Sequence, residues 1–261
     1  MTIGLLLTLS PLLVSGFSQI WLAHQSGVHE TTAKSFNKDK LAKMKTAAES
    51  YNEKLLDSGT FLTEAADSIP GYSEDLNLMG DSVMGTLKIP KIGLTVPVYH
   101  GTSEATLVQG VGHLQGSSLP VGGKGTHAVL TGHRGLPSAM LFTRLDEIKK
   151  GDTFELDVLD TKLHYEVDQI EVIWPYQTDR IKLNPEADEV TLVTCTPFGV
   201  NNKRLLVKGH RVSKPKKQVK ASPLGKVQWM LLGLSALLLT GLLFLLLWGR
   251  HRRKQEMEKK E

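Results

Sequence analysis

The chain has 261 residues, a formal net charge of +4 and a single cysteine. This length allows one large domain or two ordinary ones, and one cysteine excludes both a disulfide framework and a zinc site built from several cysteines. Two uncharged, apolar stretches, residues 2–23 and residues 227–248, are each long enough to cross a bilayer. A wholly soluble protein is therefore not expected. A polytopic transporter is not expected either, because nothing between the two stretches is apolar for long enough.

The charge is distributed unevenly along the chain. Residues 24–212 hold 20 Lys and Arg against 24 Asp and Glu, so the folded part is acidic and the basic excess flanks the second apolar stretch. Basic residues beside a membrane span bind anionic lipid headgroups, whereas a nucleic-acid-binding protein needs a basic face on its folded part. We therefore expect a membrane as a partner and no nucleic acid.

The two apolar stretches predict a membrane topology. Residues 2–23 read as an N-terminal anchor or a cleaved signal, and the lack of a basic start and of a good cleavage site favours the anchor. Residues 213–226 form a basic stem, residues 227–249 a transmembrane helix and residues 250–261 a basic tail. The basic cluster at 250–254 abuts the second span, which favours a cytoplasmic tail and an extracellular domain at the cell membrane.

Residues 24–84 are predicted to form an extracellular helical region that ends in a loop. Apolar side chains recur at three- and four-residue steps within residues 32–58, which predicts an amphipathic helix laid on a domain; they are Leu41, Met44, Ala48, Tyr51 and Leu55. Residues 59–84 are rich in Gly, Ser, Asp and Asn, which predicts a long loop with a helical turn at 73–76.

Residues 85–212 are dominated by short β segments. We predict strands at 86–89, 94–99, 127–133, 154–158, 162–174, 190–195 and 204–209, and helical pieces at 103–109 and 139–148. Many short strands with few helices predict a closed or nearly closed β-barrel.

Cys195 ends one predicted strand, and Arg204 opens the next after a Pro- and Gly-containing loop. Antiparallel strands joined by such a loop would place the two residues side by side. A free thiol titrates near about 8.5, so it needs a nearby cation to react at neutral pH. A guanidinium is always charged and offers forked donors to an oxyanion. The alternatives are a buried structural cysteine and a surface arginine.

His133 lies at another strand end, next to Gly132 and close to Gly135. Histidine is the usual proton carrier near neutral pH, and the flanking glycines leave its ring room and exposure. His100 and His113 are its rivals. No residue cluster indicates a metal and no glycine motif indicates a nucleotide, so we expect no metal and no cofactor.

Three segments carry a family resemblance. Residues 191–201 read Thr-Leu-Val-Thr-Cys-Thr-Pro-Phe-Gly-Val-Asn, with Arg-Leu-Leu-Val from residue 204; residues 131–139 read Thr-Gly-His-Arg-Gly-Leu-Pro-Ser-Ala; residues 85–92 read Gly-Thr-Leu-Lys-Ile-Pro-Lys-Ile. They resemble the active-site strand pair, the histidine segment and the first barrel strand of sortases, and are most similar to class C, the pilus-assembling class of Gram-positive bacteria. The resemblance covers residues 84–212, about half of the chain.

The resemblance implies a mostly β fold, an eight-stranded sortase barrel with short helices, between two transmembrane helices. It implies a cysteine transpeptidase of the thiol-protease kind, with Cys195 as nucleophile, His133 as proton carrier and Arg204 as substrate and oxyanion ligand. Thr194 and Thr196, which flank the cysteine, are the predicted substrate-binding residues.

The implied partners are LPxTG-type surface proteins or pilin subunits and an amine acceptor. Sortases cut a Leu-Pro-x-Thr-Gly signal between Thr and Gly, hold the Thr as a thioester and pass it to an amine. In class C the acceptor is usually a pilin lysine. The alternatives are a wall-anchoring sortase that uses a peptidoglycan amine and a catalytically inert membrane-anchored scaffold.

One departure from class C concerns the lid. Class C enzymes usually carry an Asp-Pro-aromatic motif that plugs the cleft, and this chain has no Asp-Pro. Asp67 and Tyr72 are the candidate lid residues, with Tyr72 as a divergent plug. The alternative is a solvated loop and an open cleft, in which a small thiol reagent reaches the cysteine readily.

Overall fold

The computed structural model describes residues 2–136 and 139–214, together with residues 233, 236, 237, 240, 241, 248 and 249. The chain divides into one unit of Ser15–Pro223 and another of Met1–Val14 with Leu224–Glu261. Most of the predicted stem, second span and tail, residues 213–261, lies outside the described residues. Within the part that is described, no helix is both long enough and apolar enough to cross a membrane.

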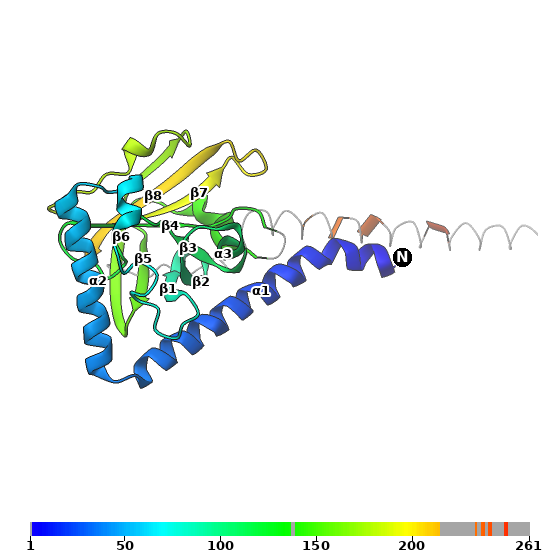
Figure 1. Cartoon of the computed structure of the whole chain (residues 1–261). Coiled ribbons are helices and arrows are strands. Elements are labelled where there is room, and N and C mark those ends of the chain that lie inside the picture. The colour runs from blue at the N-terminus through cyan, green and yellow to red at the C-terminus, as the bar shows by residue number, and fades with distance from the viewer. Residues whose placement is uncertain are drawn as a thin grey trace, which may run out of the picture. The chain divides into compact units, whose positions relative to one another are not determined.

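Eight strands close into a barrel in the order β1-β2-β3-β4-β7-β8-β6-β5 (Figure 1). They run Val83–Ile89 (β1), Leu94–His100 (β2), Val111–His113 (β3), Thr126–Thr131 (β4), Thr153–Val158 (β5), Thr161–Ile173 (β6), Asp188–Thr196 (β7) and Lys203–Val212 (β8). The pairs β2–β3 and β4–β7 are parallel, and the other six are antiparallel. The predicted eight-stranded, mostly β barrel is confirmed.

Short helical segments connect the strands. They are η1 (Glu64–Ser68), η2 (Pro90–Ile92), α3 (Glu104–Gln109), η3 (Leu141–Glu147) and η4 (Thr178–Arg180). The helical pieces predicted at 103–109 and 139–148 correspond to α3 and η3, although η3 is a 3-10 helix. The turn expected at 73–76 is present, since the N–H of Asp75 donates to the carbonyl of Gly71 (2.8 Å), and η1 lies earlier in the same loop.

The helix predicted at 32–58 is divided between two helices, α1 (Thr2–Ser35) and α2 (Lys38–Ser58). Asn37 separates them, because its side chain accepts a hydrogen bond of 2.8 Å from the backbone N–H of Asp39 and so caps α2. At the other end, Gly59 adopts the left-handed conformation (φ 63°) that commonly ends a helix.

The predicted apolar face of α2 packs on the barrel. Ala48, Tyr51 and Leu55 are buried on it. Asn52 adds two hydrogen bonds to the backbone of Leu119. Its side-chain amide donates to the Leu119 carbonyl (3.0 Å), and its side-chain oxygen accepts from the Leu119 N–H (2.7 Å). The helix is therefore held by apolar burial and by a paired hydrogen bond.

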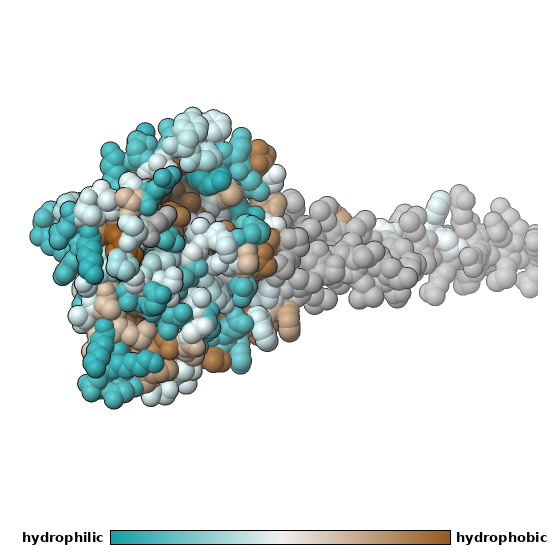
Figure 2. All heavy atoms as spheres, viewed as in Figure 1, coloured by the Kyte–Doolittle hydropathy of each residue, from teal (hydrophilic) through white to brown (hydrophobic). Residues whose placement is uncertain are grey.

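One core fills the barrel and continues under α2 and η3. Its largest fully buried side chains are Tyr51, Tyr165, Phe142, Leu55, Leu76, Met84, Leu87, Ile89, Leu119, Leu130, Leu141 and Leu145. Hydrophilic residues cover most of the face of the folded part seen in Figure 2. The packed core gives the strand ends a rigid support, on which a reactive group can be held in place.

Candidate active site

Cys195 and Arg204 lie directly opposite each other in the antiparallel β7–β8 ladder. Both side chains are partly exposed near the end of this strand pair. The Arg204 guanidinium is braced by the loop, because its Nη1 donates to the carbonyls of Asn201 (3.3 Å) and Lys203 (3.1 Å). Cys195 and Arg204, which are predicted from the sequence to lie side by side, are thus cross-strand neighbours.

His133 reaches the same end of the barrel from β4. This strand is parallel to β7, with Thr131 paired to Val193, so continuing the register by two residues brings His133 level with Cys195. The N–H of Gly132 donates to the Val193 carbonyl (3.1 Å) and extends the ladder past the end of β4.

Glycine is required at position 132 by close packing. A Cβ there would lie 2.7 Å from the ring of Phe142, a residue of η3. The N–H of Phe142 in turn donates to the carbonyl of His133 (3.1 Å). The histidine backbone is therefore held by η3 as well as by β7.

The His133 ring is one quarter exposed, and its Nε2 lies 3.2 Å from Oε1 of Glu104, at the start of α3. Glu104 is 78% exposed, so water screens this contact and its contribution is small. Sequence reasoning did not identify Glu104, because 29 residues separate it from the histidine.

The two threonines predicted to bind substrate face the histidine loop instead. Thr194 is 1% exposed, and its hydroxyl donates to the carbonyl of Gly132 (2.7 Å). The Thr196 hydroxyl accepts a hydrogen bond of 3.1 Å from Nη1 of Arg134. The Thr194 side chain is buried and already bonded within the protein, and its contact with substrate stays a prediction.

The candidate lid residues lie in the loop before β1. Asp67 belongs to η1. Tyr72 is buried, with 7% of its surface exposed, and its hydroxyl bonds to the backbone carbonyl (3.0 Å) and the ring Nδ1 (3.1 Å) of His113 and to the N–H of Gly101 (2.9 Å). The solvated-loop alternative is therefore wrong at Tyr72, which attaches the loop to the barrel.

The other two candidate histidines, His100 and His113, help to attach this loop to the barrel. His113 is fully buried, its Nε2 lies 2.8 Å from the Ser118 carbonyl, and burial lowers its pKa to about 4. His100 bonds through Nε2 to the carbonyl of Asp75 (2.8 Å) and packs edge-on against Tyr72. These contacts give both histidines structural roles in holding the loop.

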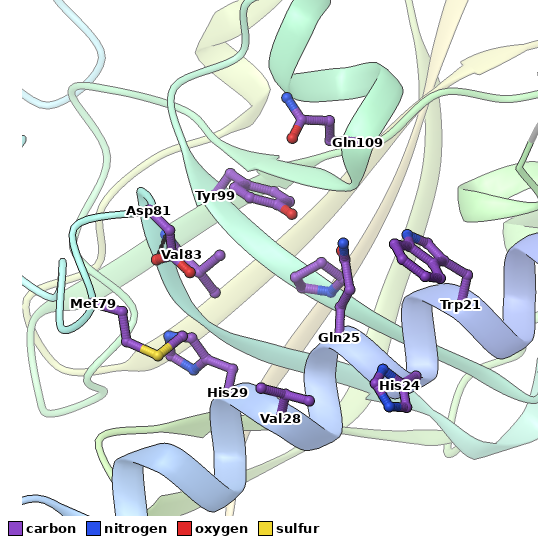
Figure 3. Close-up of a pocket in the computed structure, with 11 residues that line it drawn as sticks. Trp21, His24, Gln25, Val28, His29, Met79, Asp81, Val83, Tyr99 and Gln109 are labelled. Atoms are coloured by element: carbon purple, nitrogen blue, oxygen red, sulfur yellow. Dashed lines mark hydrogen bonds between the residues drawn. The ribbon is translucent and has the colours of Figure 1, made fainter.

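A cavity of about 420 Å³ lies between α1, β1 and β2 (Figure 3). It is lined by residues such as Trp21, Gln25, Asp81 and Tyr99, and by none of the three candidate catalytic residues. The candidate active site is therefore defined by its residues and not by this cavity. Among the described side chains, no group of three or more His, Cys, Asp or Glu is placed to hold a metal ion.

Comparison with known proteins agrees with this geometry. Residues 87–212 match the sortase domain family, and the chain belongs to the sortase family. Several of its structural neighbours are class C sortases, which confirms the class indicated by the motifs.

Two solved structures and one sequence relative illustrate the match. Sortase C1 of Streptococcus agalactiae is 39% identical, with a TM-score of 0.68 over 73% of this chain and 99% of that chain. Clostridium perfringens sortase C, solved with the C-terminal cell wall sorting motif, is 37% identical, with a TM-score of 0.65 over the same shares. Sortase D of Bacillus subtilis is 36% identical over 132 residues, and the match spans 49% of this chain and 64% of that protein.

Proposed function

We propose that this protein is a cysteine transpeptidase that cleaves an LPxTG-type sorting signal between Thr and Gly and joins the Thr to an amine, a pilin lysine during pilus polymerisation. The observation that carries the proposal is the cross-strand pairing of Cys195 with Arg204, with His133 two residues past the end of the adjacent parallel strand β4. A thiol, an imidazole and a guanidinium together supply the nucleophile, the proton carrier and the oxyanion ligand that acyl transfer needs.

In the first step, the thiolate of Cys195 attacks the carbonyl carbon of the signal's Thr. The negative charge that develops on the carbonyl oxygen is stabilised by Arg204, whose Nε and Nη2 make no hydrogen bond to any residue that the structure describes. The C–N bond to Gly then breaks, and protonated His133 gives its proton to the leaving amine. The products are a Thr thioester on Cys195 and a free Gly amine.

In the second step, an incoming amine attacks the thioester. Neutral His133 takes a proton from that amine as the new C–N bond forms. The C–S bond breaks and returns the thiolate of Cys195, so protons and charges balance over the whole cycle. Two thioester steps replace one difficult amide exchange.

The substrate and the location are part of the proposal. The Clostridium perfringens neighbour was solved with its cell wall sorting motif, which supports a sorting signal as the substrate here. The apolar stretches at 2–23 and 227–249 and the basic residues beside the second support a membrane anchor with the catalytic domain outside the cell.

The acceptor distinguishes this proposal from wall anchoring by a peptidoglycan amine. The purified domain is incubated with a Leu-Pro-x-Thr-Gly peptide and equal amounts of a lysine-containing pilin peptide and a peptidoglycan-stem amine, and the products are identified by mass spectrometry. A product joined through the lysine ε-amine supports pilin polymerisation. Exclusive transfer to the stem amine would establish the wall-anchoring alternative, and no turnover would leave the inert scaffold.

A further inference from the structure

Two hydrogen bonds bracket the catalytic pair. The residue before the cysteine, Thr194, bonds to the residue before the histidine, Gly132, at 2.7 Å. The residue after the cysteine, Thr196, bonds to the residue after the histidine, Arg134, at 3.1 Å. The second bond continues the contact between the histidine loop and β7 beyond Gly132, whose N–H extends the β4–β7 ladder.

Arg134 connects three parts of the site. Its Nη1 donates to Thr196 on β7, its Nη2 forms an ion pair of 2.7 Å with Asp146 on η3, and its guanidinium carbon lies 5.9 Å from the ring centre of Phe198 in the β7–β8 loop. The forked donors of one guanidinium can hold two acceptors at a fixed separation, which an ammonium cannot do.

This guanidinium is costly to bury. Its side chain is only 7% exposed, and its Nε is buried with no hydrogen-bond partner among the described residues. Unpaired buried donors are rare in folded proteins and call for an explanation, such as a functional role. A guanidinium at the protein surface would avoid that cost, but it would no longer connect the histidine loop with the β7–β8 loop.

We propose that Arg134 is a positioning residue, which sets the spacing between Cys195 and His133 through its bond to Thr196 while Asp146 fixes its orientation. Arg134 does not contact the reacting atoms in this role. A nearby imidazolium stabilises a thiolate, so loss of the spacing lowers both the reactivity of the thiol and the rate of proton transfer. The inference rests on the proposed function for its catalytic part only.

Two measurements test the role in the full folded domain. The first is the second-order rate of Cys195 alkylation by iodoacetamide, with His133→Ala as the baseline. The second is kcat and KM for peptide-to-amine transfer. We expect Arg134→Gln to lower kcat at least tenfold with KM changed less than threefold, and to bring alkylation close to the His133→Ala rate. Thr196→Val should act in the same direction, and Thr196→Ser, which keeps the hydroxyl, should restore most of the rate.

Arg144→Gln is the matched control. Arg144 lies on η3, is also 7% exposed, pairs with Glu147 at 2.8 Å and donates to the carbonyl of Ile92 at 3.2 Å. The Arg144→Gln variant should have a lower melting temperature without a selective loss of kcat. If Arg134→Gln fails to fold, the comparison of Thr196→Val with Thr196→Ser tests the positioning role by itself.

The possible outcomes distinguish the positioning role of Arg134 from the proposed transpeptidase function. Wild-type kcat and alkylation in Arg134→Gln, or in Thr196→Val, would overturn the positioning role. So would a kcat loss no larger than that of Arg144→Gln. A wild-type domain without transferase activity whose alkylation still falls in Arg134→Gln would refute the proposed function and support the positioning role.

Discussion

The hydroxyl of Thr194 lies 2.7 Å from the carbonyl oxygen of Gly132, inside the barrel. This contact joins the strand that carries the nucleophile to the segment that carries the histidine, 62 residues apart in sequence. It therefore makes one rigid unit of two catalytic segments that the chain brings together only by folding.

Thr194→Val should weaken this unit. The substitution keeps the shape and leaves the Gly132 carbonyl without its donor, which costs about 1–3 kcal/mol for a buried polar group. Chemical denaturation should show a loss of that size, together with a lower kcat. Thr194→Ser keeps the hydroxyl and serves as the control; equal losses in both variants would show that the hydrogen bond is not the cause.

Arg204→Lys should damage catalysis although it keeps the charge. The ammonium lacks the forked donors for an oxyanion and for the braces at Asn201 and Lys203. Losing an oxyanion donor commonly costs a factor of about 10²–10³ in kcat, and we expect a loss in that range in steady-state assays. Arg211→Lys, the same change farther along β8, should stay close to wild type. Nearly wild-type kcat in Arg204→Lys would refute the oxyanion role.

Tyr72→Phe should destabilise the protein without opening its active site. The change removes the hydroxyl that bonds His113 and Gly101 and leaves buried polar groups unpaired, at a cost of about 1–3 kcal/mol. Alkylation of Cys195 by a small thiol reagent should change by less than about threefold. A large acceleration in Tyr72→Phe or Tyr72→Ala, with the fold intact, would instead identify Tyr72 as a plug over the cysteine.

The stability of the protein should fall as the pH drops from about 6.5 to about 4. Burial lowers the pKa of His113 to about 4, whereas an unfolded histidine titrates near about 6.5. Between these values the unfolded chain binds a proton that the folded chain does not, so acid favours unfolding. The contribution of His113 reaches about 3 kcal/mol at the lower end, from about 1.4 kcal/mol per pKa unit.

The contribution of His113 is isolated by comparing wild type with His113→Gln. Other groups, such as His127, whose pKa is also lowered by burial, affect both proteins equally. Urea unfolding between pH 4 and pH 7 should show a smaller pH dependence in the variant. Parallel stability curves for the two proteins would contradict a neutral, buried His113.

Local sequence signals identified the parts of the site that a single strand or turn defines. The loop between β7 and β8 is short, so the pairing of Cys195 with Arg204 follows from their places at its two ends. The break at Asn37 was missed by the prediction of one helix over 32–58, although Asn before Lys-Asp is a helix-start signal.

Other parts had no local signal. Strand β3 has three residues with Gly112 in the middle, too few to show alternation. The bonds from Thr194 and Thr196 to the histidine loop span 62 residues, and the burial of Tyr72 depends on His113, 41 residues away. Such contacts arise from the closure of the barrel, which no segment of the sequence encodes alone.

The central claim is a thioester on Cys195, and intact-mass spectrometry tests it most directly. Wild-type protein mixed with a Leu-Pro-x-Thr-Gly peptide, without an amine acceptor, should gain the mass of the peptide up to its Thr, and the adduct should disappear with hydroxylamine. Cys195→Ala should keep its fold by circular dichroism and gain nothing. Transfer of peptide to an amine by Cys195→Ala, or turnover in the wild type through an adduct on another residue, would contradict the account.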